Sequence, residues 1–330
     1  MRKTVCATLA VMMSVLFSPL SQAGQAWESY KARFFKPEGR IVDTGNGGVS
    51  HTEGQGFAML MAVANDDKAT FDKLWQWTNR ELKNKENGLF YWRYNPAESN
   101  PVADKNNAAD GDVLIAWALL KADARWHEKR YGAASDAITK ALVAHSVIRY
   151  AGYRVMLPGV QGFKLDGEAI LNPSYFVFPA WQAFAGRSHL PVWRDLIKDG
   201  KRLLGKMGSG KADLPADWVS LASDGKLEPA KSWPPRMSYD AIRIPLYLAW
   251  SDKQSPLLAP WKAWFGQFPR EQTPAWVNVT TNEYAPYMME GGLLAVRDLT
   301  MGQSSGEPEI TSKDDYYSAS LKMLAWISAQ

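Results

Sequence analysis

Apolar residues recur at helical spacing along nearly the whole chain, and this pattern predicts α-helices rather than strands. Strand-like alternation is confined to two short stretches, Gly88–Tyr94 and Tyr153–Leu157. The sequence therefore predicts an all-α protein. The segments with apolar residues at i, i+3 and i+4 are Ala26–Phe35, Gly54–Ala64, Lys68–Leu82, Asp112–Trp126, Tyr131–Ile148, Pro173–Phe184, Pro191–Met207, Tyr239–Trp250, Pro256–Phe265, Pro286–Val296 and Tyr316–Ile327.

The predicted helices differ in polarity. Asp112–Trp126 is apolar over much of its surface, whereas Tyr131–Ile148 and Pro191–Met207 carry Lys, Arg and Asp on one side. A helix that is apolar on nearly every side is buried, and an amphipathic helix packs outside it. This alternation predicts a toroid of inner and outer helices, with the long loops Leu82–Asn107 and Met207–Ser238 forming a cleft at one rim. No Ser-, Gly- or Pro-rich linker divides residues 24–330, so we expect a single domain.

The first 23 residues have the composition of a secretory signal peptide. A basic pair, Arg2 and Lys3, precedes an apolar stretch over residues 5–17 that is too short to span a bilayer. Small residues then precede a cleavage site near Ala23. The only cysteine is Cys6, so the mature chain contains none. Export without disulfides predicts a Gram-negative periplasmic or secreted protein with no membrane anchor.

Charge and aromatic content narrow the function. The signal peptide carries two basic and no acidic residues, so the net charge of +4 falls to +2 in the mature chain. The basic residues are dispersed and form no stripe of the kind that binds nucleic acid or a membrane surface. All 15 Trp lie in the mature part. Such an excess indicates stacking platforms for flat apolar ligand faces, although core packing accounts for more than half of them.

Neither metal chemistry nor a serine nucleophile is indicated. The four His, at positions 51, 127, 145 and 189, have no partner at metal-ligand spacing, and no G-x-S-x-G motif occurs. We therefore expect no metal or other cofactor, and carboxylates remain as the candidate chemical groups.

Carboxylates stand at the starts of three predicted helices: Glu53, Asp110 with Asp112, and Asp240. Each has a purely structural interpretation, because an acidic residue there caps a helix or complements its dipole. Asp240 has a further one, an ordinary i, i+3 ion pair with Arg243. In a toroid, however, alternate helices begin at the same rim, so these acids can meet in one cleft.

The helix start at Glu53 has two further features. Thr52 is placed to cap the helix, and Gly54 and Gly56 occupy its first turn. Glycine weakens a helix, a cost accepted more readily where a ligand approaches closely. We therefore expect a ligand near this turn.

A convergent set of carboxylates suits glycoside hydrolysis. That reaction needs a protonated acid for the leaving oxygen and an ionised base to activate water. Burial or a neighbouring negative charge raises the pKa of one carboxyl and keeps it protonated.

The motif around Asp110 resembles the signature of glycoside hydrolase family 8. The residues that fit it are Ala108, Asp110, Gly111, Asp112, Ile115, Ala116, Ala118, Leu119, Leu120, Ala122 and Trp126. Ala109 departs from it, because a hydroxyl residue is usual there. Further similarity lies in Glu53-Gly54-Gln55, in Trp92, and in the segments 172–176 and 238–243. The resemblance extends along most of the mature chain and is closest to the periplasmic endoglucanase branch associated with bacterial cellulose synthesis.

The resemblance implies an (α/α)6 barrel and an inverting mechanism without a metal. By analogy, Glu53 is the general acid and Asp240 is the general base. Asp110 is assigned to sugar distortion and charge stabilisation at the cleavage subsite, because a single displacement needs no covalent nucleophile. For inversion we expect the carboxyls of Glu53 and Asp240 to lie roughly 6.5–9.5 Å apart.

The remaining assignments by resemblance concern substrate binding. Tyr175, Tyr239 and Arg243 hold the base and the sugar, and Trp92 stacks on a glucosyl ring. Asp112 is grouped with these sugar-contacting candidates, with a structural cap as the competing interpretation.

The leading prediction is an endo-acting β-1,4-glucanase that binds a cellulose-type chain as a monomer, in functional association with cellulose synthase machinery. Within the family, the alternatives are chitosanase, xylanase and mixed-linkage glucanase. Outside it, they are a polysaccharide lyase with a Tyr or His base and a non-catalytic glucan-binding protein that uses its Trp residues alone.

Overall fold

A computed structural model describes residues 24–303 and 306–330, so the predicted signal peptide lies outside the described part. In the described part, no helix combines the length and apolar character needed to cross a membrane. The α-helices are α1 (Gln25–Phe34), α2 (Thr52–Ala64), α3 (Lys68–Glu81), α4 (Ala109–Trp126), α5 (Lys129–His145), α6 (Phe178–Ser188), α7 (Pro191–Leu204), α8 (Arg243–Ser251), α9 (Ala259–Phe265), α10 (Gly291–Thr300) and α11 (Tyr316–Ala329).

Short strands join these helices in small antiparallel sheets. Strand β1 pairs with β2, β3 with β4, and β8 with β9, and β6 lies between β5 and β7. Short 3₁₀ helices occur at Pro173–Tyr175, Pro256–Leu258 and Arg270–Gln272. The strands are β1 (Ser50–His51), β2 (Arg93–Tyr94), β3 (Val147–Tyr150), β4 (Tyr153–Met156), β5 (Glu168–Leu171), β6 (Val219–Ala222), β7 (Leu227–Pro229), β8 (Arg236–Met237) and β9 (Val277–Asn278).

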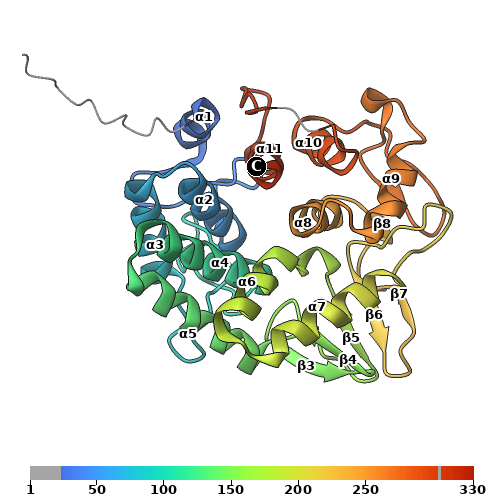
Figure 1. Cartoon of the computed structure of the whole chain (residues 1–330), viewed down its shortest axis with the longest axis horizontal. Coiled ribbons are helices and arrows are strands. Elements are labelled where there is room, and N and C mark those ends of the chain that lie inside the picture. The colour runs from blue at the N-terminus through green and yellow to red at the C-terminus, as the bar shows by residue number, and fades with distance from the viewer. Residues whose placement is uncertain (1–23, 304–305) are drawn as a thin grey trace, which may run out of the picture.

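The helices form a ring with an outer layer, as Figure 1 shows. Helices α2, α4, α6, α8 and α11 contact one another in that order, and α11 also contacts α2, which closes the ring. Around it, α3 packs on α2, α5 on α4, α7 on α6 and α1 on α11, while α10 packs on both α8 and α11. The predicted toroid of inner and outer helices is therefore confirmed.

Burial follows the predicted difference in polarity. In α4, nearly every side chain from Ala109 to Leu119 is buried, as expected for an inner helix. In α7, Trp193, Leu196 and Leu203 face the interior, and basic residues between them are exposed. One continuous cluster of buried apolar side chains runs through the ring and its outer layer.

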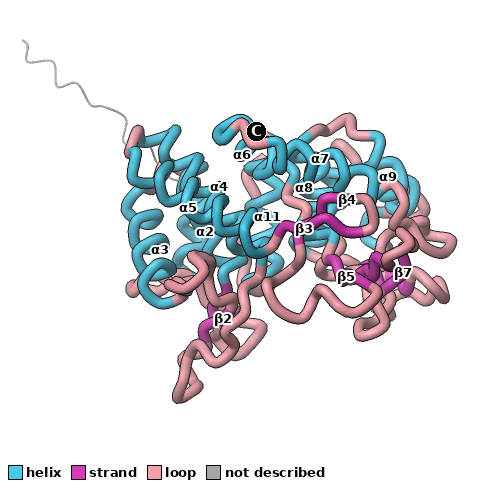
Figure 2. The backbone as a smooth tube through the Cα atoms, turned by 90° about the horizontal axis from the view of Figure 1, so that it is seen from below, coloured by secondary structure: helices cyan, strands magenta, loops and turns pink. Residues whose placement is uncertain are grey.

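The longest loops lie together on one side of the helices, with β2 among them (Figure 2). Strand β1 runs directly into α2, and its partner β2 belongs to the long loop that ends at α4. The sheet therefore connects the starts of two neighbouring inner helices.

Several predicted boundaries were wrong. Helix α8 begins at Arg243 instead of Tyr239, and α10 begins at Gly291 instead of Pro286. The predicted helix ending at Ile148 stops at His145, because the next residues form β3 and pair with β4. The three-stranded sheet β5–β6–β7 was not predicted. Its strands are only three or four residues long, too short to show a clear alternation.

Candidate active site

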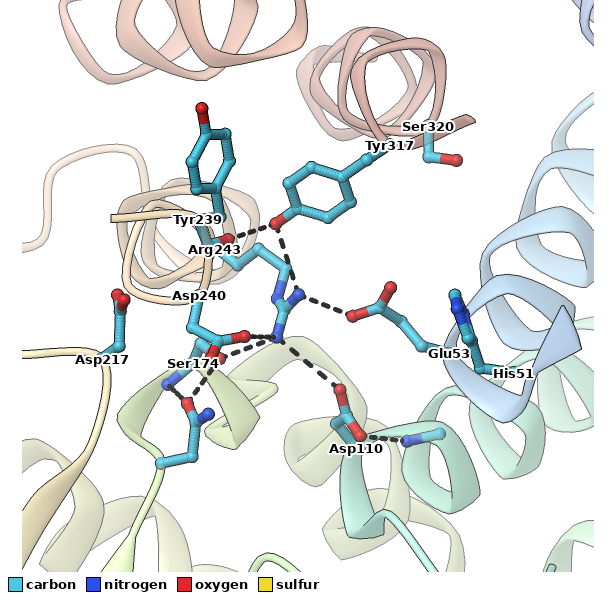
Figure 3. Close-up of polar contacts among 12 residues, drawn as sticks. His51, Glu53, Asp110, Ser174, Asp217, Tyr239, Asp240, Arg243, Tyr317 and Ser320 are labelled. Atoms are coloured by element: carbon cyan, nitrogen blue, oxygen red, sulfur yellow. Dashed lines mark hydrogen bonds and ion pairs between the residues drawn. The ribbon is translucent and has the colours of Figure 1, made fainter. Parts of the chain in front are cut away.

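The predicted carboxylates converge where the inner helices begin (Figure 3). Glu53 is in the first turn of α2, and Asp110 is in the first turn of α4. Asp240 lies in the turn immediately before α8. The three acids therefore meet at one rim of the toroid, as predicted.

Arg243, the first residue of α8, lies between the three acids. Its Nη1 is 2.6 Å from Glu53 Oε2, and its Nη2 is 3.0 Å from Asp240 Oδ1 and 3.8 Å from Asp110 Oδ2. Only 4% of the Arg243 side chain is exposed. The expected pair with Asp240 is present, but Arg243 also bridges two carboxylates from other helices, so its role is not confined to α8.

Hydroxyl groups complete the shell around Arg243. Its Nη2 donates to Ser174 Oγ at 2.9 Å, and its Nη1 donates to Tyr317 Oη at 3.3 Å. The Tyr317 hydroxyl in turn donates to the backbone carbonyl of Tyr239. Asn172 Oδ1 accepts from the Ser174 hydroxyl at 2.6 Å. Reasoning from the sequence missed Ser174 and Tyr317 as individual residues, although Ser174 falls in a segment that carries the family resemblance.

Asp110 is buried, and its pKa is raised to about 8. Burial is the largest cause, and the negative charge of Glu53 adds to it. The Arg243 guanidinium and the Gly111 backbone N–H act in the opposite direction without cancelling the rise. The raised pKa favours the protonated form of Asp110, which can donate a hydrogen bond.

Asp112 is not among the residues that line the cavity formed by Glu53, Trp92, Asp110 and Tyr175. It is fully buried, and its carboxylate accepts from Phe90 N at 2.9 Å and from Asn107 Nδ2 at 2.8 Å. Burial raises its pKa to about 7. These contacts attach the long loop to α4. The Asp112 side chain lines neither cavity of the site, and it does not cap the helix.

Four of the predicted site residues line one cavity of about 160 Å³, namely Glu53, Trp92, Asp110 and Tyr175. His51 lines it as well, and its Nε2 lies 3.0 Å from Asp43 Oδ2. The Trp92 indole N–H donates to Asp104 at 2.7 Å, which sets the orientation of the ring.

Tyr239 lies on a second, larger hollow of about 610 Å³, which Tyr287 and Tyr317 also line. Tyr239 is 45% exposed, and its hydroxyl is 3.3 Å from that of Tyr287. Because Tyr317 contacts Arg243, this hollow adjoins the acid cluster.

The Trp residues divide between the core and the loops. Trp27, Trp181, Trp193 and Trp264 are fully buried, as the core-packing interpretation expects. Trp92, Trp218 and Trp233 are only partly buried and belong to the loops. Trp218 and Trp233 stack on each other with ring centroids 4.6 Å apart, and Phe163 stacks on Trp218 at 5.7 Å.

The expectations at the start of α2 need correction. The Thr52 hydroxyl is buried without a hydrogen-bond partner, so Thr52 does not cap the helix. A Cβ at Gly54 would lie 2.6 Å from the Tyr316 hydroxyl, and one at Gly56 would lie 2.5 Å from Leu114 Cβ. Close packing of α11 and α4 on α2 therefore accounts for glycine at these two positions.

A further acid, Asp217, was not predicted. It lies in the loop between α7 and α8, and burial together with the negative charge of Asp240 raises its pKa to about 6. Its position within the long Trp-rich loop was the only sequence signal that could have drawn attention to it.

Over residues 24–303 and 306–330, no group of three or more His, Cys, Asp or Glu side chains is arranged to hold a metal ion. The positive charge beside the acids of the site belongs to Arg243.

Burial and the charges of Asp110 and Asp240 raise the pKa of Tyr175 well above its usual value, so its hydroxyl stays protonated at neutral pH. Tyr175 is therefore poorly suited to act as the base of a lyase.

Comparison with known proteins places the chain in a family. The model of glycosyl hydrolases family 8 matches residues 1–330. An endoglucanase from Cellulomonas uda is 62% identical over 303 residues, which cover 92% of this chain and 84% of that protein. The chain belongs to glycosyl hydrolases family 8.

Solved structures agree with this assignment. The endoglucanase Cel10 from Klebsiella pneumoniae, a family 8 glycosyl hydrolase, is 66% identical with a TM-score of 0.92, covering 93% of this chain and 99% of that one. The endo-beta-1,4-glucanase CMCax from Acetobacter xylinum is 38% identical with a TM-score of 0.88, covering 92% and 97%. The prediction of an (α/α)6 barrel is confirmed.

Proposed function

We propose that this protein is an endo-acting β-1,4-glucanase that hydrolyses cellulose-type chains with inversion of configuration. The observation that carries the proposal is the pair of carboxylates, Glu53 and Asp240, held on the two Nη atoms of one buried arginine. The similarity to proteins described as endoglucanases supports the substrate class.

In the proposed reaction, Glu53 protonates the departing glycosidic oxygen, and Asp240 accepts a proton from the attacking water on the opposite face of the sugar. The water oxygen forms the new bond to the anomeric carbon as the glycosidic bond breaks. A sugar bound between the two carboxyls displaces water, which favours the protonated form of an acid. Asp110, whose raised pKa favours the protonated form, donates a hydrogen bond to the sugar at the cleavage subsite.

Aromatic and polar groups bind the chain on either side of this centre. Trp92 stacks on a glucosyl ring, because the apolar C–H face of the sugar matches an indole face. Tyr175 orients the sugar from the cavity, Arg243 holds the base Asp240, and Tyr239 contributes from the adjoining hollow.

The other candidate activities fit the site less well. A non-catalytic binder has no use for three carboxyls gathered on a buried guanidinium, because burying charge opposes folding. A lyase needs a Tyr or His base, and Tyr175 is held in its neutral form. Chitosanase, xylanase and mixed-linkage glucanase remain the alternatives in substrate. We further propose that the enzyme acts as a periplasmic or secreted monomer, cleaved near Ala23, in functional association with cellulose synthase machinery.

The test is Glu53→Gln assayed on carboxymethylcellulose. Removing the acid should lower reducing-sugar release by roughly 10²–10⁴-fold, because general acid catalysis contributes about that much. Binding of cello-oligosaccharides should persist. Glu283→Gln, which changes an exposed glutamate, is the matched control and should behave as the parent enzyme.

Two further measurements decide stereochemistry and specificity. Proton NMR of the first product should show the α-anomer, and an initial β-anomer would exclude inversion. Cellulose, xylan, chitosan and mixed-linkage glucan assayed side by side should show the highest rate on the cellulose-type chain. If Glu53→Gln turns over substrate as fast as the parent enzyme, Glu53 is not the general acid.

A further inference from the structure

Asp217 holds the turn that carries Asp240. Its Oδ1 accepts from Ser238 N at 2.9 Å and from Ala241 N at 2.8 Å, and its Oδ2 accepts from the Ser238 hydroxyl. These donors flank Asp240 in the chain on both sides. A single carboxylate therefore fixes the backbone before and after the proposed base.

The turn needs such an acceptor because it precedes a helix. Backbone N–H groups at a helix start have no partner within the helix. Asp217 supplies that partner from a different part of the chain, and its own N–H donates to Arg236 O at 2.7 Å. Asp240 itself is 32% exposed, and its carboxylate contacts Arg243 at 3.0 Å. This contact involves the Asp240 side chain, so the backbone of the turn is held by other groups.

Asp217 also contributes charge. Its carboxyl lies beside that of Asp240 (Figure 3), and the charge of Asp240 is one of the causes that raise the pKa of Asp217 to about 6. The influence is mutual, because two like charges oppose each other's ionisation equally. When Asp217 is ionised, it places a negative charge near the carboxyl of the proposed base.

We propose that Asp217 is a positioning residue for the general base: it fixes the turn that carries Asp240 and places a second negative charge beside the carboxylate that takes a proton from water. The proposal rests on the assignment of Asp240 as that base.

Other charged and titratable groups around Asp240 come from several elements. They are Arg243 on α8, Tyr317 on α11, Tyr175 before α6, Asp110 on α4 and Glu53 on α2. A substitution at Asp217 leaves all of them in place, so a change in pH dependence reports on Asp217.

Two substitutions separate position from charge. Asp217→Asn removes the charge but keeps the hydrogen bonds, because its amide oxygen accepts from both backbone N–H groups and its amide nitrogen donates to the Ser238 hydroxyl. Asp217→Ala removes both. Asp224→Asn removes an equal charge from an exposed position on the same loop and serves as the matched control.

We expect different results from the two variants on carboxymethylcellulose. Asp217→Asn should have the same kcat as the parent at the pH optimum. The acid limb of its pH profile of kcat/KM should lie at lower pH by roughly 0.5–1 unit. Asp217→Ala should lose roughly 10–100-fold in kcat with little change in KM, because misplaced catalytic groups slow the chemical step. Asp224→Asn should match the parent in both respects.

An acid limb in Asp217→Asn that coincides with that of the parent would overturn the proposal, and this holds even if Asp217→Ala fails to fold. Parental kcat in a folded Asp217→Ala would also overturn it. Asp240→Asn is measured in parallel to test the base itself. If Asp240→Asn is inactive and the Asp217 variants match the parent, the glucanase assignment stands and only this proposal fails. Parental turnover in Asp240→Asn would overturn both.

Discussion

A single buried cation, Arg243, faces three carboxyl groups. Burying charge is unfavourable unless it is paired, and one guanidinium cannot neutralise three carboxylates. The excess negative charge is reduced at Asp110. This residue is buried and lies farther from Arg243 than either Glu53 or Asp240. The raised pKa of Asp110 favours its protonated form, which lowers the negative charge that Arg243 has to balance.

The raised pKa of Asp110 makes stability depend on pH. Its value of about 8 lies above the ordinary value of 3.8, so the folded state binds a proton that the unfolded state has released. The resulting stability is complete below about pH 4 and is lost as the pH rises to about 8. Asp110→Asn has no proton to lose. Its melting temperature should therefore rise relative to the parent as the pH increases from 4 to 8.

Differential scanning calorimetry at several pH values tests this prediction. The melting temperature of the variant relative to the parent should be higher at pH 8 than at pH 4, by about 2–4 °C for each kcal/mol of stability that the parent loses. Asp224→Asn, at an exposed position, should show no such trend. A difference in melting temperature that stays constant with pH would contradict the protonated state of Asp110.

At the level of residues, the sequence identified the acids but not their supports. Glu53, Asp110 and Asp240 are recognisable because each carboxylate stands at the start of an apolar helix. Asp217 and Tyr317 lack such a signal. Asp217 lies in a loop, and its partner turn is more than 20 residues away, so only the folded chain reveals the contact.

At the level of elements, close approach of the inner helices brings the acids together. Gly56 allows α4 to pack on α2, and Gly111 lies so close to Thr52 that a Cβ there would be 2.1 Å from its hydroxyl oxygen. Gly54 leaves room for the Tyr316 hydroxyl, which donates to Glu53 Oε1 at 3.3 Å. These glycines therefore set both the packing of the ring and the surroundings of Glu53.

Gly54→Ala should consequently destabilise the protein and impair catalysis. A Cβ 2.6 Å from the Tyr316 hydroxyl forces α11 away from α2. Overpacking of this kind costs about 1–3 kcal/mol, and displacement of Tyr316 removes a hydrogen bond from Glu53. Adding Tyr316→Phe removes the atom that clashes most, so the double variant should regain part of the lost stability but not the lost activity. Chemical denaturation and assays on carboxymethylcellulose measure the two effects.

Gly186→Ala provides the matched control. Gly186 is an exposed residue of α6, and a Cβ there would meet no atom within 4 Å. Alanine should stabilise this helix by roughly 0.5–1 kcal/mol and leave activity unchanged. If Gly54→Ala were as stable as Gly186→Ala, the close approach of α2 and α11 would not be the reason for glycine at position 54.

Helical periodicity predicted the presence of the helices but not all of their boundaries. It reports which side chains are buried, and those near a helix start can be buried without being helical. The residues just before α8 illustrate this, because Ala241 and Ile242 are buried although they do not belong to the helix. Helix α10 likewise begins only at Gly291, although Ala285 and Met289 are already buried.

At the level of the whole molecule, the ring joins elements from both ends of the chain. Helix α11 contacts α2 and α8 within the ring, and α1 packs outside it. Both α2 and α11 are buried along most of their length. Neither can bury those surfaces without the other, so a part of the ring formed alone would expose much of its core. The alternation of inner and outer helices was visible in the sequence, whereas the closure between α2 and α11 depends on contacts that no local pattern encodes.

This closure predicts cooperative unfolding. Far-UV circular dichroism, Trp fluorescence and hydrolytic activity should all be lost in one denaturant transition, because the site is made of residues from the starts of the ring helices. Leu324→Ala on α11 and Leu114→Ala on α4 each remove a fully buried side chain and should lower the free energy of unfolding by about 2–5 kcal/mol. In both variants the three transitions should move together. A Leu324→Ala protein that loses activity well before its helical signal would show that α11 can detach alone, and the ring would then not unfold as one unit.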